Sequence, residues 1–224
     1  MKVTTDACLF GGWVAEKVKS QKSKIKNVLD IGGGTGLLSL MFAQKNSNAI
    51  IDAIEIDDEA YTQAKENIAS SPFADRVHAI HGDARDFSFD KKYDLIISNP
   101  PFYEIELKSE NELKNVAHHG EELSMRELFI VIRNDLADDG IFFVLLPYKR
   151  YNEIREILFE TNLSLTELTF IRQSTQHDYF RIILKGRSGS DDVETEINEI
   201  SIWDDQQQYT KEFTELLKDY YLYL

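Results

Sequence analysis

The fold class of this chain is decided by the stretch Val28-Leu29-Asp30-Ile31-Gly32-Gly33-Gly34-Thr35-Gly36-Leu37-Leu38. An apolar run ends in a glycine cluster and a second apolar segment follows at once, which predicts a strand that turns directly into a helix. Glycines let a ligand approach the backbone of such a turn closely, because they carry no Cβ atom. A dinucleotide-binding loop would need a glycine where Leu37 stands, so a nicotinamide dehydrogenase is disfavoured.

Asp30 lies at the end of the predicted strand, where its carboxylate would repel a pyrophosphate. An acid at this place suits a ligand with a positive amine, and S-adenosylmethionine (SAM) carries both an amine and a sulfonium. The alternative is a tight turn that binds no ligand. We expect Asp30, Gly32, Gly34 and Gly36 to bind SAM.

Strand-like and helix-like segments alternate along most of the chain. Runs rich in Val, Ile, Leu and Phe lie at Asn27–Ile31, Ile50–Glu55, Val77–His81, Tyr93–Ser98 and Ile141–Leu146. Segments with helical spacing lie at Gly36–Gln44, Asp58–Ser70, Ser124–Ala137 and Tyr151–Thr161. This alternation predicts an α/β fold with a parallel sheet covered by helices. Leu165–Arg172 and Tyr179–Lys185 are separated only by a loop, so we expect an antiparallel final pair that completes seven strands.

Two further acids follow the second and third predicted strands. Glu55 lies nineteen residues after Gly36, where an acid commonly accepts both ribose hydroxyls of a nucleoside. Asp83 can accept a hydrogen bond from an adenine amine while the Ala84 N–H donates to the ring. Either acid could be an ordinary surface residue, but acids at three successive strand ends favour a nucleoside site.

Asn99-Pro100-Pro101-Phe102-Tyr103 follows the fourth predicted strand. The amine of adenine is a poor nucleophile because its lone pair is delocalised. The Asn99 side-chain oxygen and the Pro100 carbonyl could each accept one of its N–H bonds, which aims the lone pair at a methyl donor. Phe102 could stack on the base. Two prolines that merely end a strand are the alternative.

The order of these motifs resembles the amino-group class of SAM-dependent methyltransferases. The segments Met1–Trp13, Ile96–Tyr103 and Gln208–Leu224 are also similar to the bacterial tRNA adenine-N6 methyltransferases, which modify the adenine 3′ of the anticodon of a valine tRNA. This resemblance covers nearly the whole chain. It implies a Rossmann-like SAM-dependent methyltransferase fold, SAM as cofactor and the tRNA anticodon loop as partner.

The same resemblance implies roles for individual residues. Thr5 and Asp6 are expected near the methionyl end of SAM, whereas Pro101 and Tyr103 are expected to contact the substrate. Phe102 stands where family members commonly have Tyr. Family members also carry a further short segment before the stretch that begins here at Met1, so part of a lid is expected to be missing.

His118 and His119 lie in the polar segment after this motif, where substrate contacts are common. We include both as candidates for substrate binding, with an ordinary loop pair as the alternative. Two adjacent histidines lack the spacing of metal ligands. Cys8 is the single cysteine, which excludes a multi-cysteine metal site, so no metal is expected.

The chain has 224 residues and a net charge of −14, which is unusual for a protein that binds RNA. Residues 191–224 hold ten acids against two lysines, a net charge of −8, and we expect them to form an acidic extension packed on a methyltransferase domain of residues 1–190. The lysines of Lys17–Lys26 and the pair Lys149-Arg150 are the candidates for phosphate contacts. We also expect a cytoplasmic protein, because the chain shows neither a signal peptide nor a membrane span, and we expect it to act as a monomer.

Two other interpretations remain open from the sequence. The first is methylation of a different amine, in a protein glutamine, in DNA adenine or in a ribosomal guanine. The second is a non-catalytic SAM-binding RNA scaffold, although such a protein would have no reason to keep Asn99 and Phe102.

Overall fold

The computed structural model describes residues 3–20, 25–101, 123–189 and 194–223. Eight strands form one sheet in the order β3-β2-β1-β4-β5-β7-β6-β8. They are β1 (Asn27–Ile31), β2 (Ile50–Glu55), β3 (Val77–His81), β4 (Tyr93–Ser98), β5 (Leu136–Pro147), β6 (Leu163–Ser174), β7 (Tyr179–Ser188) and β8 (Glu196–Trp203). The α/β fold with a mostly parallel sheet is confirmed, with eight strands where the sequence predicted seven.

β7 runs antiparallel to both of its neighbours, β5 and β6, as expected for the final pair. The additional strand is β8, which pairs in parallel with β6 and ends the sheet. Its apolar residues Ile197, Ile200 and Ile202 alternate imperfectly with acids, and Ile197 is exposed. β8 comes from the acidic segment predicted as an extension, so a boundary at residue 190 stays a prediction.

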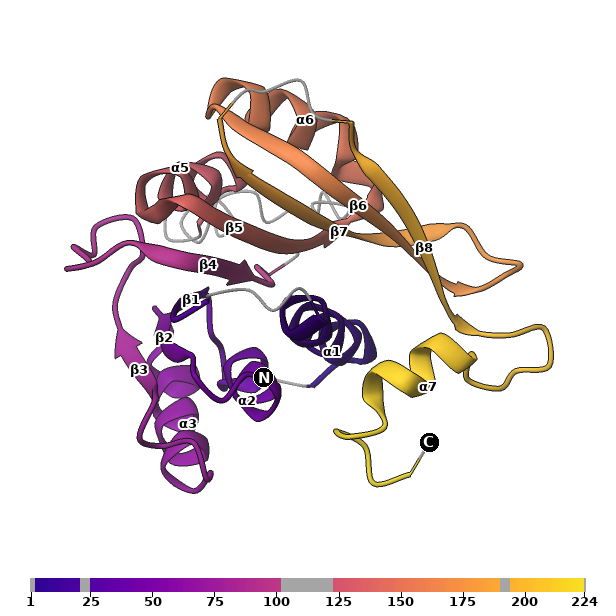
Figure 1. Ribbon diagram of the computed structural model, residues 1–224, viewed down its shortest axis with the longest axis horizontal. Helices are drawn as coiled ribbons and strands as arrows, with labels where there is room; N and C mark the ends of the chain where they lie inside the picture. Colours follow the sequence, from indigo (N-terminus) through magenta and orange to yellow (C-terminus); the bar gives the residue numbers. More distant parts are fainter. Residues whose placement is uncertain (1–2, 21–24, 102–122, 190–193, 224) are drawn as a thin grey trace, which may run out of the picture.

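The helices are α1 (Thr5–Ser20), α2 (Leu37–Lys45), α3 (Asp58–Ala69), α5 (Met125–Asp135), α6 (Tyr151–Glu160) and α7 (Lys211–Leu217), together with the short 3-10 helix η1 (Tyr148–Arg150). Figure 1 shows α5 and α6 on one side of the sheet and α1, α2, α3 and α7 on the other. Each side has its own apolar core, so the sheet is buried on both faces.

The sequence pattern missed α1, which contains the glycine pair Gly11-Gly12. Phe10 of this helix is fully buried, and Trp13 meets Phe143 of β5 edge-on with 5.6 Å between the ring centroids. A Cβ atom on Gly12 would lie 2.9 Å from the Leu216 carbonyl oxygen of α7. The glycine therefore lowers helix propensity in exchange for close packing of two helices.

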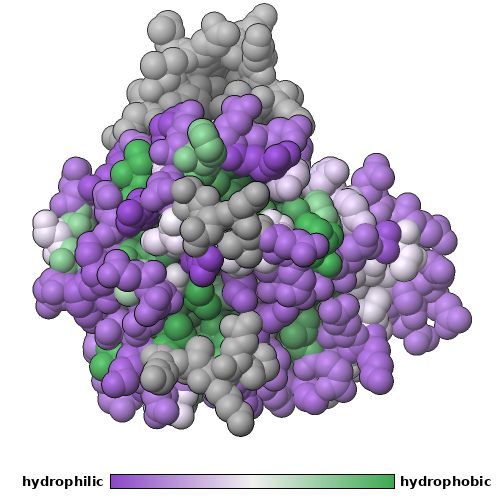
Figure 2. All heavy atoms as spheres, turned by 45° about the horizontal axis from the view of Figure 1, so that its top comes forward, coloured by the Kyte–Doolittle hydropathy of each residue, from purple (hydrophilic) through white to green (hydrophobic). Residues whose placement is uncertain are grey.

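α5 ends at Asp135, two residues before the predicted end, because Leu136 already begins β5. The helix starts with a capping box in which Ser124 accepts from the Glu127 N–H and Glu127 accepts from the Ser124 N–H. Figure 2 shows a largely hydrophilic surface on the face turned forward, with hydrophobic atoms in separate patches. No helix in the described ranges is long and apolar enough to cross a membrane.

Candidate functional site

Four neighbouring strands end at one edge of the sheet and bring the predicted site residues there. Ile31 of β1 pairs with Ile54 of β2 and with Ser98 of β4, while Glu55 pairs with His81 of β3. The segments that follow these strands therefore leave the sheet side by side. Ligands of open parallel sheets bind at this carboxyl edge.

The glycine loop adopts the left-handed backbone expected of a close-approach turn. Gly32, Gly34 and Gly36 have φ angles of 71°, 55° and 85°. The Gly32 and Gly33 N–H groups both donate to the Ile54 carbonyl at 3.0 Å, which fastens the loop to β2. A Cβ atom built on Gly32 would meet nothing within 4 Å, so the space above this glycine is open for a ligand.

Glu55 is buried and its carboxylate faces the glycine loop. Its Oε2 atom accepts from the Gly34 N–H at 2.8 Å, and its Oε1 atom accepts from the Asp57 N–H at 2.9 Å. Each oxygen has a second lone pair, so the carboxylate can still accept two hydroxyl groups. Asp57 caps α3 by accepting from the Ala60 N–H.

Asp30 is fully buried at the end of β1. The pKa of its carboxyl is raised to about 7: burial is the main cause and the nearby Glu55 adds to the rise, while the Ser39 hydroxyl, which donates to Oδ2 at 2.7 Å, opposes it. The other oxygen, Oδ1, is buried without a hydrogen-bond partner among the described residues. A buried acceptor without a partner is costly, so this atom fits a ligand that brings a positive amine.

Asp83 is held by Arg85, a residue that the sequence reading did not select. The Arg85 guanidinium contacts both carboxylate oxygens at 2.5–3.0 Å, and the Arg85 N–H donates to Oδ1 at 2.9 Å. Arg85 keeps the pKa of the Asp83 carboxyl below its usual range and also lies 3.5 Å from Glu127 of α5. The Asp-Ala-Arg spacing could have revealed this pair, because a turn brings the two side chains together. Ala84 is half-buried beside them.

Asn99 follows β4 directly. Its Oδ1 atom is buried and has no hydrogen-bond partner in the described part of the chain, as the amine-clamp hypothesis requires of an acceptor. Ser98 fixes the strand end by donating from its hydroxyl to the Ile31 carbonyl at 2.8 Å. Pro100 is buried and Pro101 is exposed. The predicted residues Phe102, Tyr103, His118 and His119 lie outside the described residues.

Thr5 and Asp6 open α1, where Thr5 is exposed. The Asp6 carboxylate accepts from the Arg181 Nε atom of β7 at 2.9 Å and from the Ala7 N–H at 3.1 Å. Asp6 thus ties the first turn of α1 to β7, a contact that sequence reasoning could not foresee between residues so far apart. No described contact tests the expected proximity of Thr5 to the methionyl end of SAM.

The candidate phosphate-binding residues include two with acidic partners. Lys17 lies 2.6 Å from the buried Glu167 of β6, and Arg150 contacts Glu153 one turn along at 2.6 Å. Lys22 and Lys24 lie outside the described residues.

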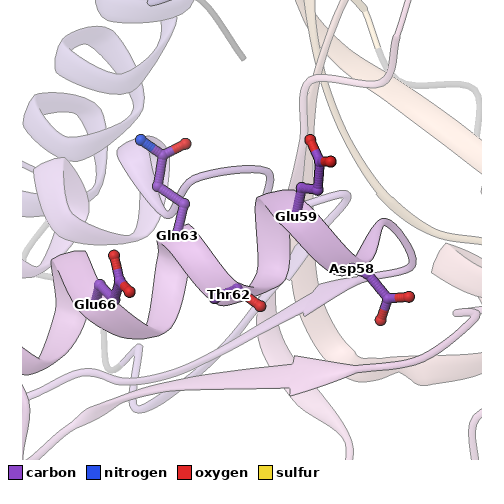
Figure 3. A pocket seen from close by; sticks show the side chains of 5 residues that line it. All are labelled: Asp58, Glu59, Thr62, Gln63 and Glu66. Carbon is purple, nitrogen blue, oxygen red and sulfur yellow. The ribbon is translucent and has the colours of Figure 1, made fainter.

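A shallow depression on α3 is a separate surface feature. Its lining side chains, Asp58, Glu59, Thr62, Gln63 and Glu66, project from one exposed face of the helix (Figure 3). Three carboxylates would repel both a phosphate and a carboxylate, so we assign no ligand to it.

SAM fits the residues at the carboxyl edge. The open space above Gly32 would take its methionyl part, Asp30 Oδ1 its amine and Glu55 its ribose hydroxyls. Asp83 would accept the adenine amine only in competition with Arg85, which already occupies both of its oxygens. These assignments remain predictions about the individual residues.

Comparison with known proteins places the chain in a family. Residues 14–144 match the methyltransferase small domain model. A protein of Dyadobacter fermentans named tRNA1(Val) (adenine(37)-N6)-methyltransferase is 37% identical and covers 99% of this chain and 91% of its own length. A protein of the same name from Yersinia enterocolitica is 34% identical over 99% of this chain and 86% of its own length.

Solved structures support the fold. A predicted O-methyltransferase from Agrobacterium tumefaciens superposes with a TM-score of 0.70 at 15% identity, covering 94% of each chain. The glycopeptide N-methyltransferase MtfA, solved with SAM, gives a TM-score of 0.58 at 13% identity over 80% of this chain and 94% of its own. Similarity at this level of identity shows the fold alone. The full-length relatives show more, and the chain belongs to the methyltransferase small domain family and, within it, to the bacterial tRNA1(Val) (adenine(37)-N6)-methyltransferases.

Proposed function

We propose that this protein transfers a methyl group from SAM to the N6 amine of an adenine in tRNA, at the position 3′ of the anticodon of a valine tRNA. The names of its full-length relatives support the substrate. The single structural observation that carries the chemistry is the buried, unpartnered Asn99 Oδ1 atom at the carboxyl edge, next to the glycine loop.

The acceptor atoms of the chain would prepare the amine for attack. Asn99 Oδ1 and the Pro100 carbonyl would each accept one N–H bond, which turns the nitrogen lone pair out of the base plane. Bound SAM supplies an electrophilic methyl group on a sulfonium. The N–C bond would form as the C–S bond of the sulfonium breaks and leaves a neutral thioether, and the nitrogen would then release one proton to water. The residues therefore need to position the amine more than to deprotonate it.

A target in an anticodon loop suits this small fold. A loop adenine is accessible without melting a helix, and the described chain shows no separate module for opening a duplex. We place the reaction in the cytoplasm, with a monomer as the working unit.

The test is mass analysis of nucleosides from valine tRNA incubated with the protein and SAM. The expected product is N6-methyladenosine at the position 3′ of the anticodon, absent when that adenine is replaced by guanine. Methylation of a DNA or protein substrate without methylation of tRNA would contradict the proposed substrate.

A further inference from the structure

Three aromatic side chains form a cluster at the carboxyl edge, beyond the residues assigned to SAM and the target amine. Tyr148 follows the last residue of β5, and Phe170 and Tyr179 lie on β6 and β7. The ring centroids of Phe170 and Tyr179 are 4.9 Å apart, and Tyr148 lies 5.8 Å and 5.6 Å from these two rings. We call these three residues the rim cluster.

The sheet register places the rim cluster at the same carboxyl edge as Asn99. Ser98 of β4 pairs with Val144 of β5, so Tyr148 lies four residues beyond the partner of Ser98, just past the end of the neighbouring strand. With about 5 Å between neighbouring strands, β7 and β6 lie about 10 and 15 Å from β4. Distances of about 10 to 15 Å correspond to about three or four stacked bases at the ~3.4 Å rise per nucleotide of a nucleic-acid strand.

Tyr148 presents an open aromatic ring. It is 40% exposed, and the plane of its ring makes angles of 69° and 60° with the rings of Phe170 and Tyr179. Neither neighbour is therefore stacked parallel on it. The stack of Trp203, Tyr209 and Phe213 differs, because its rings lie within 21° of parallel and Phe213 is fully buried. That stack is internal packing, whereas Tyr148 has a surface left for a partner.

Two guanidinium groups lie beside the rim cluster, each paired with a carboxylate. The Arg172 guanidinium lies 5.7 Å from the Tyr179 ring centroid and contacts Glu199 at 3.2 Å, and Glu199 also accepts from the Tyr179 hydroxyl at 2.5 Å. Arg181 stands opposite Pro147 and donates to Asp6. These ion pairs balance the charge at this edge, so the aromatic rings rather than a positive patch would provide the contact with a base.

We propose that Tyr148, supported by Phe170 and Tyr179, is a stacking platform for an unpaired base of the RNA loop that carries the target adenine. This inference rests on the proposed function. Proteins recognise single-stranded RNA by stacking splayed bases on aromatic rings and guanidinium planes, and stacking tolerates any base. The rim cluster holds the loop while Asn99 receives one of its bases.

The test measures binding of a fluorescein-labelled anticodon stem-loop RNA by anisotropy, alongside SAM binding by calorimetry. Tyr148→Ala should raise the Kd for RNA roughly tenfold, the effect of losing one stacked base, and leave the Kd for SAM unchanged. Tyr148→Phe keeps the ring and should stay within twofold. Tyr148→Leu keeps apolar contact with Phe170 but has no ring, so it should weaken RNA binding even if the alanine variant fails to fold.

Phe159→Ala is the matched control, since Phe159 is 84% exposed near the far end of α6. It should bind RNA like the wild type. The platform is overturned if Tyr148→Leu and Tyr148→Ala bind RNA within twofold of wild type. If the wild type methylates this RNA, such a result leaves the proposed function intact. A wild type that binds RNA through Tyr148 but never methylates it contradicts the proposed function alone, and one that does not bind it contradicts both.

Discussion

The Gly34 N–H donates to the Glu55 Oε2 atom at 2.8 Å, which joins the glycine loop to the end of β2 through a buried carboxylate. The loop and the acid are therefore one unit: the residue expected to bind the ribose also sets the backbone that would surround the methionyl part. A change in Glu55 should act on both stability and ligand affinity.

Replacing Glu55 by Ala should weaken SAM binding by about 2–3 kcal/mol, because hydrogen bonds to a charged acceptor are lost. Calorimetry with SAM measures this effect. The apo protein should also lose stability, since the Gly34 and Asp57 N–H groups lose their acceptor. Glu59→Ala, on the exposed face of α3 (Figure 3), should change neither quantity. Unchanged SAM affinity in Glu55→Ala would remove its ribose role.

Gly32→Ala should weaken SAM binding far more than it weakens folding. The φ of 71° makes an L-residue strained, at a cost of about 1–2 kcal/mol, and the new Cβ would enter the open space above the loop. Gly189→Ala is the matched control, because Gly189 has a φ of 102° and also nothing within 4 Å of a Cβ atom. Both variants should melt at lower temperature, and only Gly32→Ala should lose SAM. Equal SAM affinity in the two variants would place the ligand elsewhere.

Asn99→Ala should leave SAM affinity nearly intact and reduce turnover about a hundredfold or more, the usual result of losing a preorganised polar group. Single-turnover methylation of tRNA with saturating SAM measures the chemical step. Asn134→Ala, on the exposed surface of α5, should have no effect on the rate. A rate within a few-fold of wild type in Asn99→Ala would refute the amine clamp.

Asp30 should make the apo protein less stable as pH rises from about 4 to about 7. Burial raises its pKa to about 7, well above the value near 3.9 in the unfolded chain. Between these values the native state keeps a proton that the unfolded state has released, so the free energy of unfolding falls with increasing pH.

The measurement compares the free energies of unfolding of wild type and Asp30→Asn in urea at about pH 4.5, 5.5 and 7, which cover the range between the two pKa values. Other carboxyls, such as Asp52 with a lowered pKa, act in the opposite direction but contribute equally to both proteins. The stability of wild type relative to Asp30→Asn should therefore decrease with pH. Parallel curves for the two proteins would mean that Asp30 titrates normally.

The sequence alone predicted seven of the eight strands, in their order along the chain, and the positions of the candidate site residues relative to them. Strand and helix periodicities, the glycine run and the prolines are local signals, so the bounds of β1–β4 agree with the structure. Parallel strands bring their carboxyl ends to one edge, and this rule was enough to gather Asp30, Glu55, Asp83 and Asn99. The resemblance on the same motifs gave the family.

The tertiary structure decided what these residues contact. Local patterns carry no record of the approach of Asp6 to Arg181, of the loss of solvent around Asp30, or of the rings beside Tyr148, because each depends on segments far apart in the chain. β8 shows the same limit, since a half-polar edge strand is stabilised by pairing with β6 rather than by its own pattern. The sequence specifies the charge and the chemical groups of each residue, whereas the burial of a side chain and its hydrogen-bond partners depend on how the strands and helices pack together.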